Sequence, residues 1–151
     1  MSNVRSVQTD KVNFFGNTSP RELASRYGTP LYVYNENVLR QRCRDLTGLS
    51  DLPGFHVNYS AKANTNPALL RIVREEGCHA DAMSPGELYM NKLAGFTADN
   101  LLYVCNNVSA DEMRNAVENG LLVSVDSLSQ LDLYGTVNPG GHLTFTIPHH
   151  I

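Results

Sequence analysis

The residues best placed to do chemistry lie around Lys62, which follows the apolar, β-prone run of residues 55–61. The chain has three lysines, and the other two, Lys11 in a polar arm and Lys92 in an amphipathic helical pattern, fit ordinary solvated positions. A lysine at the carboxyl end of a strand can instead face a cleft, where its amine is available for reaction. The residues alone leave a solvated turn lysine open, because loop lysines are mostly exposed.

Polar side chains of the next predicted strand, residues 78–83, could approach the same place. His79 and Asp81 lie in that run, and side chains at a strand end can hydrogen-bond a neighbouring loop. Ser84 starts the helical pattern that follows. It is expected to cap that helix, and a position facing the cleft is the alternative.

The cysteines and histidines do not form a metal-ligand pattern. Cys43, Cys78 and Cys105 are widely spaced and odd in number, so we expect reduced, buried thiols rather than disulfides or a zinc site. His149 and His150 are adjacent, and adjacent side chains of a strand point to opposite faces. A solvated tail is therefore favoured over a metal pair, and no metal is expected.

Composition excludes several classes of protein. The chain has 151 residues, 42% hydrophobic and 18% charged, which suits one globular domain rather than a disordered chain. The net charge of -3, with scattered basic residues, favours neither nucleic acid nor an anionic membrane as a partner. Residues 1–10 lack the apolar segment of a signal peptide, and no run approaches the roughly 18 apolar residues of a spanning helix. We expect a cytoplasmic protein.

Helix-start signals and β-prone runs alternate along the chain. Ser19, Ser84 and Ser109 each precede a glutamate by three residues, the spacing of a capping box, and Asn66 precedes a proline. The predicted helices cover about 19–27, 35–47, 66–77, 84–94, 109–120 and 127–134. The predicted strands cover 31–34, 55–61, 78–83, 101–105, 121–125 and 142–147.

From residue 55 the strand starts recur every 20 to 23 residues, which indicates one βα unit per repeat. Helical crossovers between the strands predict a parallel sheet, in either a doubly wound fold or a βα-barrel. No glycine-rich dinucleotide or nucleotide loop follows a strand, which favours the barrel. A full barrel has eight units, so the sequence predicts a partial TIM barrel with about five strands. We expect residues 1–30 to form an arm with a short helix, and residues 31–151 the incomplete barrel domain.

Four stretches make this chain similar to the N-terminal part of the fold-type III, pyridoxal phosphate (PLP)-dependent decarboxylases. They are YGTPLYVY at 27–34, YSAKAN at 59–64, ADAMSPGEL at 80–88 and VDS at 125–127. The combination of the second and third stretches, about twenty residues apart, is more specific than either alone. The resemblance implies an α/β barrel of the alanine-racemase type.

The resemblance also implies the roles of two residues. Lys62 would form the Schiff base with pyridoxal 5'-phosphate, and Asp81 aligns with an acidic residue that lies near the cofactor. A lysine with that role must present a neutral amine near pH 7, which calls for desolvation or positive neighbours. The implied reaction is decarboxylation of a small-molecule amino acid by a homodimer. Diaminopimelate is the favoured substrate, and ornithine, arginine and a carboxy-polyamine such as carboxynorspermidine remain open.

The end of the chain departs from the family pattern. Members typically read Arg-x-Asn-Pro on the fifth strand, where this chain has FTIP at 145–148 with Thr146 near the place of the arginine. Residues 142–151 therefore look divergent or frame-altered. Because the later family motifs lie beyond these residues, we expect the chain alone to be poorly folded and catalytically inactive. A PLP-binding module without decarboxylase activity and an inert fragment are the alternatives.

Overall fold

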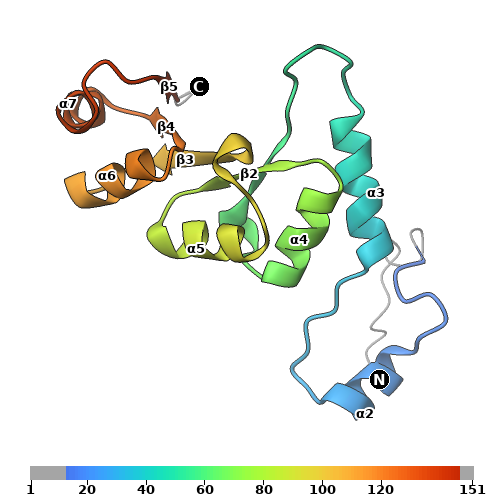
Figure 1. Ribbon diagram of the computed structural model, residues 1–151. Coiled ribbons are helices and arrows are strands. Elements are labelled where there is room, and N and C mark those ends of the chain that lie inside the picture. The colour runs from blue at the N-terminus through green and yellow to red at the C-terminus, as the bar shows by residue number, and fades with distance from the viewer. Residues whose placement is uncertain (1–12, 147–151) are drawn as a thin grey trace, which may run out of the picture. The chain divides into compact units, whose positions relative to one another are not determined.

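The computed structural model describes residues 13–146, and the chain divides into two compact units, Met1–Arg42 and Cys43–Ile151. The second unit contains every strand of the described chain (Figure 1). His149 and His150 lie outside the described residues, so the expectation of a solvated tail there stays a prediction. The predicted division between an arm and a barrel domain at residues 30 and 31 also remains a prediction.

A five-stranded parallel sheet is the centre of the second unit. Its strands are β1 (Asn58–Ser60), β2 (His79–Ala82), β3 (Leu101–Cys105), β4 (Leu122–Val125) and β5 (Leu143–Phe145), paired in that order. Each neighbouring pair is parallel. The five strands expected from residue 55 onward are confirmed, although β1 is shorter than the apolar run that encodes it. Residues 61–63 turn into a short 3-10 helix instead of extending the strand.

Helices connect the strands where the cap signals predict them. They are α4 (Pro67–Glu75), α5 (Pro85–Leu93), α6 (Ala110–Glu118) and α7 (Leu128–Val137), with 3-10 helices η1 (Ala61–Ala63) and η2 (Ala98–Asn100). The side chains of Asn66, Ser84, Ser109 and Ser127 each accept a hydrogen bond from the first turn that follows. These local bonds fix the starts of the helices. The end of α7 lies three residues beyond the predicted Tyr134.

The order of the strands distinguishes between the two predicted architectures. Consecutive strands are neighbours throughout, with no reversal of the order. Right-handed crossovers then place the connecting helices on one face of the sheet, as in a βα-barrel, whereas a doubly wound sheet has helices on both faces. The chain therefore forms part of a TIM barrel, as its sequence predicts.

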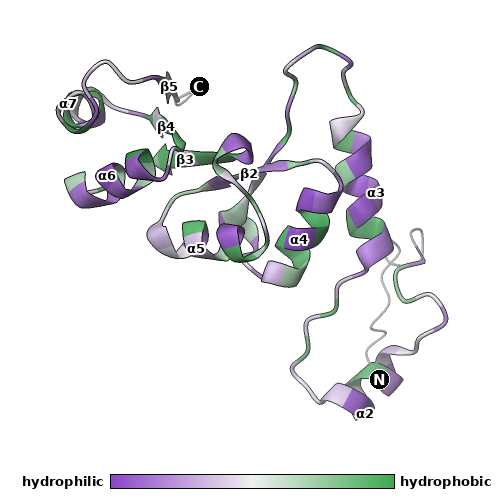
Figure 2. Cartoon of the chain, viewed as in Figure 1, coloured by the Kyte–Doolittle hydropathy of each residue, from purple (hydrophilic) through white to green (hydrophobic). Residues whose placement is uncertain are grey.

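The core lies on the helix-covered face of the sheet. Alternate strand residues are fully or nearly fully buried there: Ala80, Ala82, Leu101, Tyr103, Cys105, Val123 and Val125. The helices contribute Leu70, Val73, Leu88, Met113 and Ala116 to the same core. Figure 2 shows hydrophobic residues gathered on β3 and β4. On the opposite face, Asp81 and Val104 are only half-buried, whereas Ser124 is buried. Barrel enzymes build their sites at the carboxyl ends of the strands rather than on a face of the sheet.

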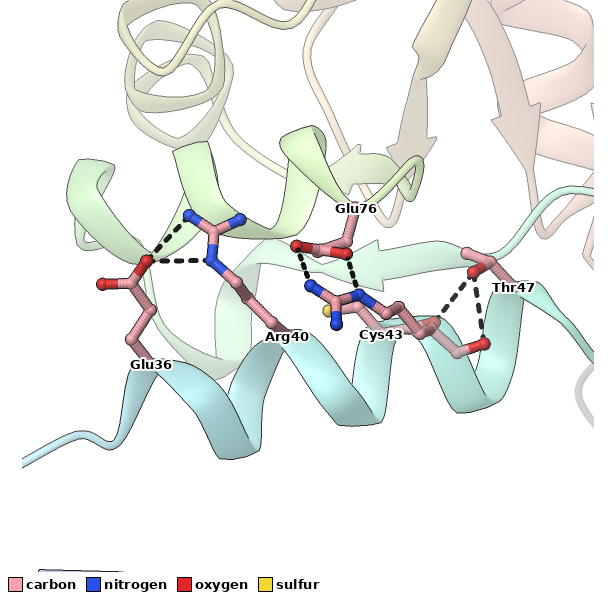
Figure 3. Close-up of polar contacts among 6 residues, drawn as sticks. Glu36, Arg40, Cys43, Thr47 and Glu76 are labelled. Atoms are coloured by element: carbon pink, nitrogen blue, oxygen red, sulfur yellow. Dashed lines mark hydrogen bonds and ion pairs between the residues drawn. The ribbon is translucent and has the colours of Figure 1, made fainter. Parts of the chain in front are cut away.

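Helix α3 (Glu36–Thr47) carries a series of polar contacts (Figure 3). Arg40 pairs with Glu36 one turn earlier at 2.8 Å. In the second unit, the guanidinium of Arg44 makes two hydrogen bonds to the carboxylate of Glu76, at 2.6 and 3.1 Å. Because Glu76 is the C-cap of α4, this fork joins the last turn of α3 to the end of α4.

The first unit contains α2 (Pro20–Tyr27) and a segment without regular secondary structure, and here one expectation is wrong. Helix α2 is capped by Ser19 and stopped by Gly28 at φ 83°, as predicted. Residues 31–34 form no strand, although their sequence is β-prone. A strand needs a neighbour to complete its backbone hydrogen bonds, and the described residues pair no strand with this segment. Tyr32 is 87% exposed.

An apolar groove of about 370 Å³ also lies in the first unit. Its lining includes Phe14, Phe15, Leu23, Ala24, Leu31 and Val33. The rings of Phe14 and Phe15 pack edge to face, 5.0 Å apart, so the apolar spot in the polar arm is a packed cluster. Of the helices in residues 13–146, none has the length and apolar content needed to cross a membrane.

Candidate active site

Lys62 lies in the middle of η1, immediately after the carboxyl end of β1. This is the position expected from the sequence, at the edge of a parallel sheet where barrel enzymes place their catalytic groups. Its neighbour Ala61 is fully buried, and Lys62 itself is exposed. The buried alanine anchors the turn, while the desolvating surroundings expected around the lysine are not formed by the described residues alone.

Asp81 holds the turn that carries Lys62. The strand register pairs Ser60 of β1 with Asp81 of β2. The hydroxyl of Ser60 donates to Oδ2 of Asp81 at 2.9 Å, and the backbone N–H of Ala61 donates to Oδ1 at 3.0 Å. Both carboxylate oxygens therefore bond the two residues that precede Lys62. The structure places Asp81 against the turn that carries Lys62 and gives its carboxylate a role in shaping that turn. The position of Asp81 beside the cofactor stays a prediction.

The start of α5 supports the other side of Asp81. Ser84 caps this helix by accepting from the N–H of Glu87 at 3.2 Å, and the carboxylate of Glu87 accepts from the N–H of Met83 at 2.7 Å. The hydroxyl of Ser84 thus has the capping role that its sequence context predicts. One turn after Glu87, the side-chain amide of Asn91 donates to the carbonyl oxygen of Asp81 at 3.1 Å.

The ring of His79 contacts His56. The two rings stack, with centroids 4.0 Å apart and planes 18° apart. Burial lowers the pKa of His79 from its ordinary value of 6.5, and the nearby His56 lowers it further. A neutral His79 avoids the repulsion that two positive imidazoliums would have at this distance.

Sequence reasoning missed the partners that hold the site together. Ser60 lies inside the YSAKAN stretch, but its contact with Asp81 depends on strand register. Asn91 is a polar residue on the buried side of an amphipathic helix, a signal that could have been noticed from its spacing after Leu88. At the far edge of the sheet, the hydroxyls of Ser124 and Thr146 lie 2.7 Å apart. Thr146 therefore bonds a neighbouring strand at the place where family members carry arginine.

The described residues contain no group of three or more His, Cys, Asp or Glu side chains that could hold a metal ion. They contain instead the exposed primary amine of Lys62, at the carboxyl edge of a parallel βα sheet. The carboxylate of Asp81 bonds Ser60 and Ala61, the two residues that precede this lysine. An exposed lysine at this edge is typical of barrel enzymes that work through a lysine amine. The chain belongs to the pyridoxal-dependent decarboxylase family, because residues 37–150 match its pyridoxal binding domain.

Sequence relatives support the family assignment. Diaminopimelate decarboxylase from Methanothermobacter thermautotrophicus is 44% identical over 128 residues, which cover 83% of this chain and 30% of that protein. The same enzyme from Bacillus subtilis is 36% identical over 114 residues, covering 74% of this chain and 26% of that one. The chain thus spans less than a third of the length of these relatives.

Solved structures show the same fold. The crystal structure of diaminopimelate decarboxylase from M. jannaschii with L-lysine has a TM-score of 0.70 at 29% identity, covering 80% of this chain and 29% of that chain. A lysine/ornithine decarboxylase from Vibrio vulnificus with putrescine has a TM-score of 0.74 at 22% identity, covering 94% and 37% of the two chains. The second likeness concerns the fold alone.

Proposed function

We propose that this chain is the PLP-binding part of an amino-acid decarboxylase that acts on diaminopimelate and releases CO2 and L-lysine. The observation that carries the proposal is the position of Lys62 in a turn fixed by Asp81, within a segment similar to diaminopimelate decarboxylases. Ornithine, arginine and carboxynorspermidine remain possible substrates of the same chemistry.

The residues at the site fit the cofactor. An exposed lysine amine can hold the aldehyde carbon of PLP covalently, and Lys62 lies where a barrel opens to its ligands. PLP, when bound, supplies an electron sink for the electron pair that remains on the α-carbon when CO2 leaves. The role of this chain is to hold the amine of Lys62 in place. Asp81 fixes the backbone of the turn and adds a negative charge beside it.

A trapping experiment tests the assignment of Lys62. The chain is incubated with PLP, reduced with borohydride, digested and analysed by mass spectrometry. We expect the reduced adduct on the peptide containing Lys62 and its loss in Lys62→Arg. Lys92→Arg is the matched control, because the ammonium of Lys92 already donates to Asn119 on the protein surface. Equal labelling of Lys11, Lys62 and Lys92 would contradict the proposal.

A chimera tests whether this part of the chain supports decarboxylation. Residues 13–146 replace the matching part of the M. thermautotrophicus enzyme, and CO2 release is measured from diaminopimelate, ornithine and arginine. We expect release from diaminopimelate that disappears with Lys62→Ala. Trapping at Lys62 without release from any of these amino acids would support a PLP-binding module that lacks decarboxylase activity.

We also propose that the complete protein is a cytoplasmic homodimer. The family resemblance supports the dimer, and the three buried free thiols support a reducing compartment. Light scattering of the complete protein measures its oligomeric state, and fractionation of the source cells measures its location.

A further inference from the structure

We infer that Asn91 is a positioning residue that sets the geometry of the Lys62 turn through Asp81. This inference rests on the proposed function of Lys62 and adds a residue of α5 to its site. Asn91 is fully buried, and its side-chain amide donates to the carbonyl oxygen of Asp81 at 3.1 Å. The side chain of Asp81 then bonds Ser60 and Ala61.

Helix α5 holds the end of β2 at two points. Glu87 and Asn91 are four residues apart, so their side chains lie on the same face of the helix. Glu87 accepts from the backbone N–H of Met83, just past the end of β2, while Asn91 bonds the carbonyl oxygen of Asp81. These two contacts fix the backbone on both sides of Ala82. The direction of the Asp81 side chain follows from that backbone.

The same helix also contacts η1 directly. Asp81 therefore lies between a helix that fixes its main chain and a turn that its carboxylate fixes in return. A shift of the Asp81 backbone moves both carboxylate oxygens and lengthens both bonds to the turn. Lys62 follows these bonds in the chain, so the same shift moves its amine.

Packing alone does not explain an asparagine at this position. The Oδ1 atom of Asn91 is buried and has no hydrogen-bond partner among the described residues. A buried polar atom without a partner opposes folding, and an apolar side chain of similar volume would avoid it. The bond from the Asn91 amide to Asp81 is what the asparagine provides and an apolar residue could not.

Gln130 on α7 is a matched control. It is buried, its amide donates to the carbonyl oxygen of Val108 at 3.4 Å, and its Oε1 atom has no partner among the described residues. Asn91→Leu and Gln130→Leu therefore make the same chemical change, each removing one amide-to-carbonyl bond and one unpartnered oxygen. Only the first bond leads to the Lys62 turn.

The experiment measures hydrogen exchange of the Ala61 amide by NMR in the full chain, beside the unfolding midpoint in guanidinium. In Asn91→Leu we expect Ala61 to exchange roughly fivefold faster than in the wild type, the effect of losing one hydrogen bond in the chain of contacts. In Gln130→Leu we expect its exchange to stay unchanged after correction for global stability. An unchanged Ala61 rate in Asn91→Leu, or equal acceleration in both variants, would overturn the inference.

The affinity for PLP, measured by absorbance titration across pH, gives the functional readout. We expect Asn91→Leu to weaken binding and alter its pH dependence, while Gln130→Leu leaves both as in the wild type. If the wild type shows no trapping at Lys62, the proposed function fails. The exchange of Ala61 still decides whether Asn91 positions the turn.

Discussion

Asp81 uses both oxygens of one carboxylate to close the turn that carries Lys62. The bond from Ala61 matters most for folding, because Ala61 is fully buried and its N–H has no access to water. A buried donor that loses its acceptor costs more than the bond itself contributes. The sequence predicted that Asp81 lies near the site, whereas its structural role depends on Ser60 and Ala61 in the neighbouring strand and turn.

Replacing Asp81 by alanine is expected to lower the free energy of unfolding by about 1–3 kcal/mol, the usual cost of a buried unsatisfied group. Asp81→Asn should cost less, since its oxygen can accept from Ala61 and its amide can donate to Ser60. Guanidinium denaturation of both variants measures the difference. Equal losses in the two variants would show that the charge of Asp81, rather than its hydrogen bonds, stabilises the turn.

The stacked pair of His56 and His79 predicts a pH dependence of stability. Because the pKa of His79 is lowered in the folded protein, the unfolded chain binds more protons at mildly acidic pH. Stability is therefore full above pH 6.5 and falls as the pH drops through 6.5 toward the folded pKa. Denaturation midpoints between pH 8 and pH 5 should show this fall, and His79→Gln should reduce it. A midpoint independent of pH would contradict the assignment.

At the scale of the elements, the helix caps were the most predictable features. Ser109 and Glu112 form the full capping box expected from their spacing. The N–H of Ser109 donates to the Glu112 carboxylate, and this bond, followed by the one from the Ser109 hydroxyl, lowers the pKa of Glu112. The predicted strand at residues 31–34 failed because pairing, unlike capping, needs a distant partner.

The cap of α6 gives a prediction about one element. Ser109→Ala removes the acceptor for the first turn and the hydroxyl that donates to Glu112. We expect a loss of about 1 kcal/mol in the free energy of unfolding, the usual value of an N-cap serine. Urea denaturation measures it. Ser127→Ala, at the cap of α7, serves as a comparison, and a Ser109→Ala protein as stable as the wild type would show that packing alone holds α6.

At the scale of the whole molecule, the two faces of the sheet differ, because helices cover one of them while Asp81 and Val104 on the other are only half-buried. The helix-covered face contains the buried core, including Tyr103, Met113 and Val123. The described sheet ends at β1 and β5, and the chain spans less than a third of its relatives' length. The structure predicts that the helix-covered core keeps the isolated chain folded, whereas the sequence predicts that the isolated chain folds poorly.

The reaction rate of the cysteine thiols shows whether the core of the isolated chain is closed. All three are buried, and burial raises the pKa of Cys78 and of Cys105 to about 12, which keeps the reactive thiolate scarce. We expect slow reaction with a disulfide reagent at pH 8 in buffer and complete reaction of three thiols in guanidinium. Fast reaction in buffer would show that the core opens in the isolated chain, as expected from the sequence.

The sequence by itself determined the family of this protein, its α-helices and the five strands of its sheet. Caps, glycine stops and the spacing of apolar residues act within a few positions of the chain, so they can be read without knowing what lies nearby. The recurrence of strand and helix also predicted the parallel sheet, and the motif around Lys62 predicts the site.

Tertiary structure decided which residues complete that site. Ser60 meets Asp81 through the register of two strands, 21 positions apart, and Asn91 reaches the same residue from a helix packed on the sheet. The spacing of Asn91 after Leu88 can indicate that it is buried, but the sequence does not show the partner in either contact, because each contact depends on how separate elements are aligned and packed. The unpaired segment at residues 31–34 has the same cause, since β propensity does not supply a partner strand.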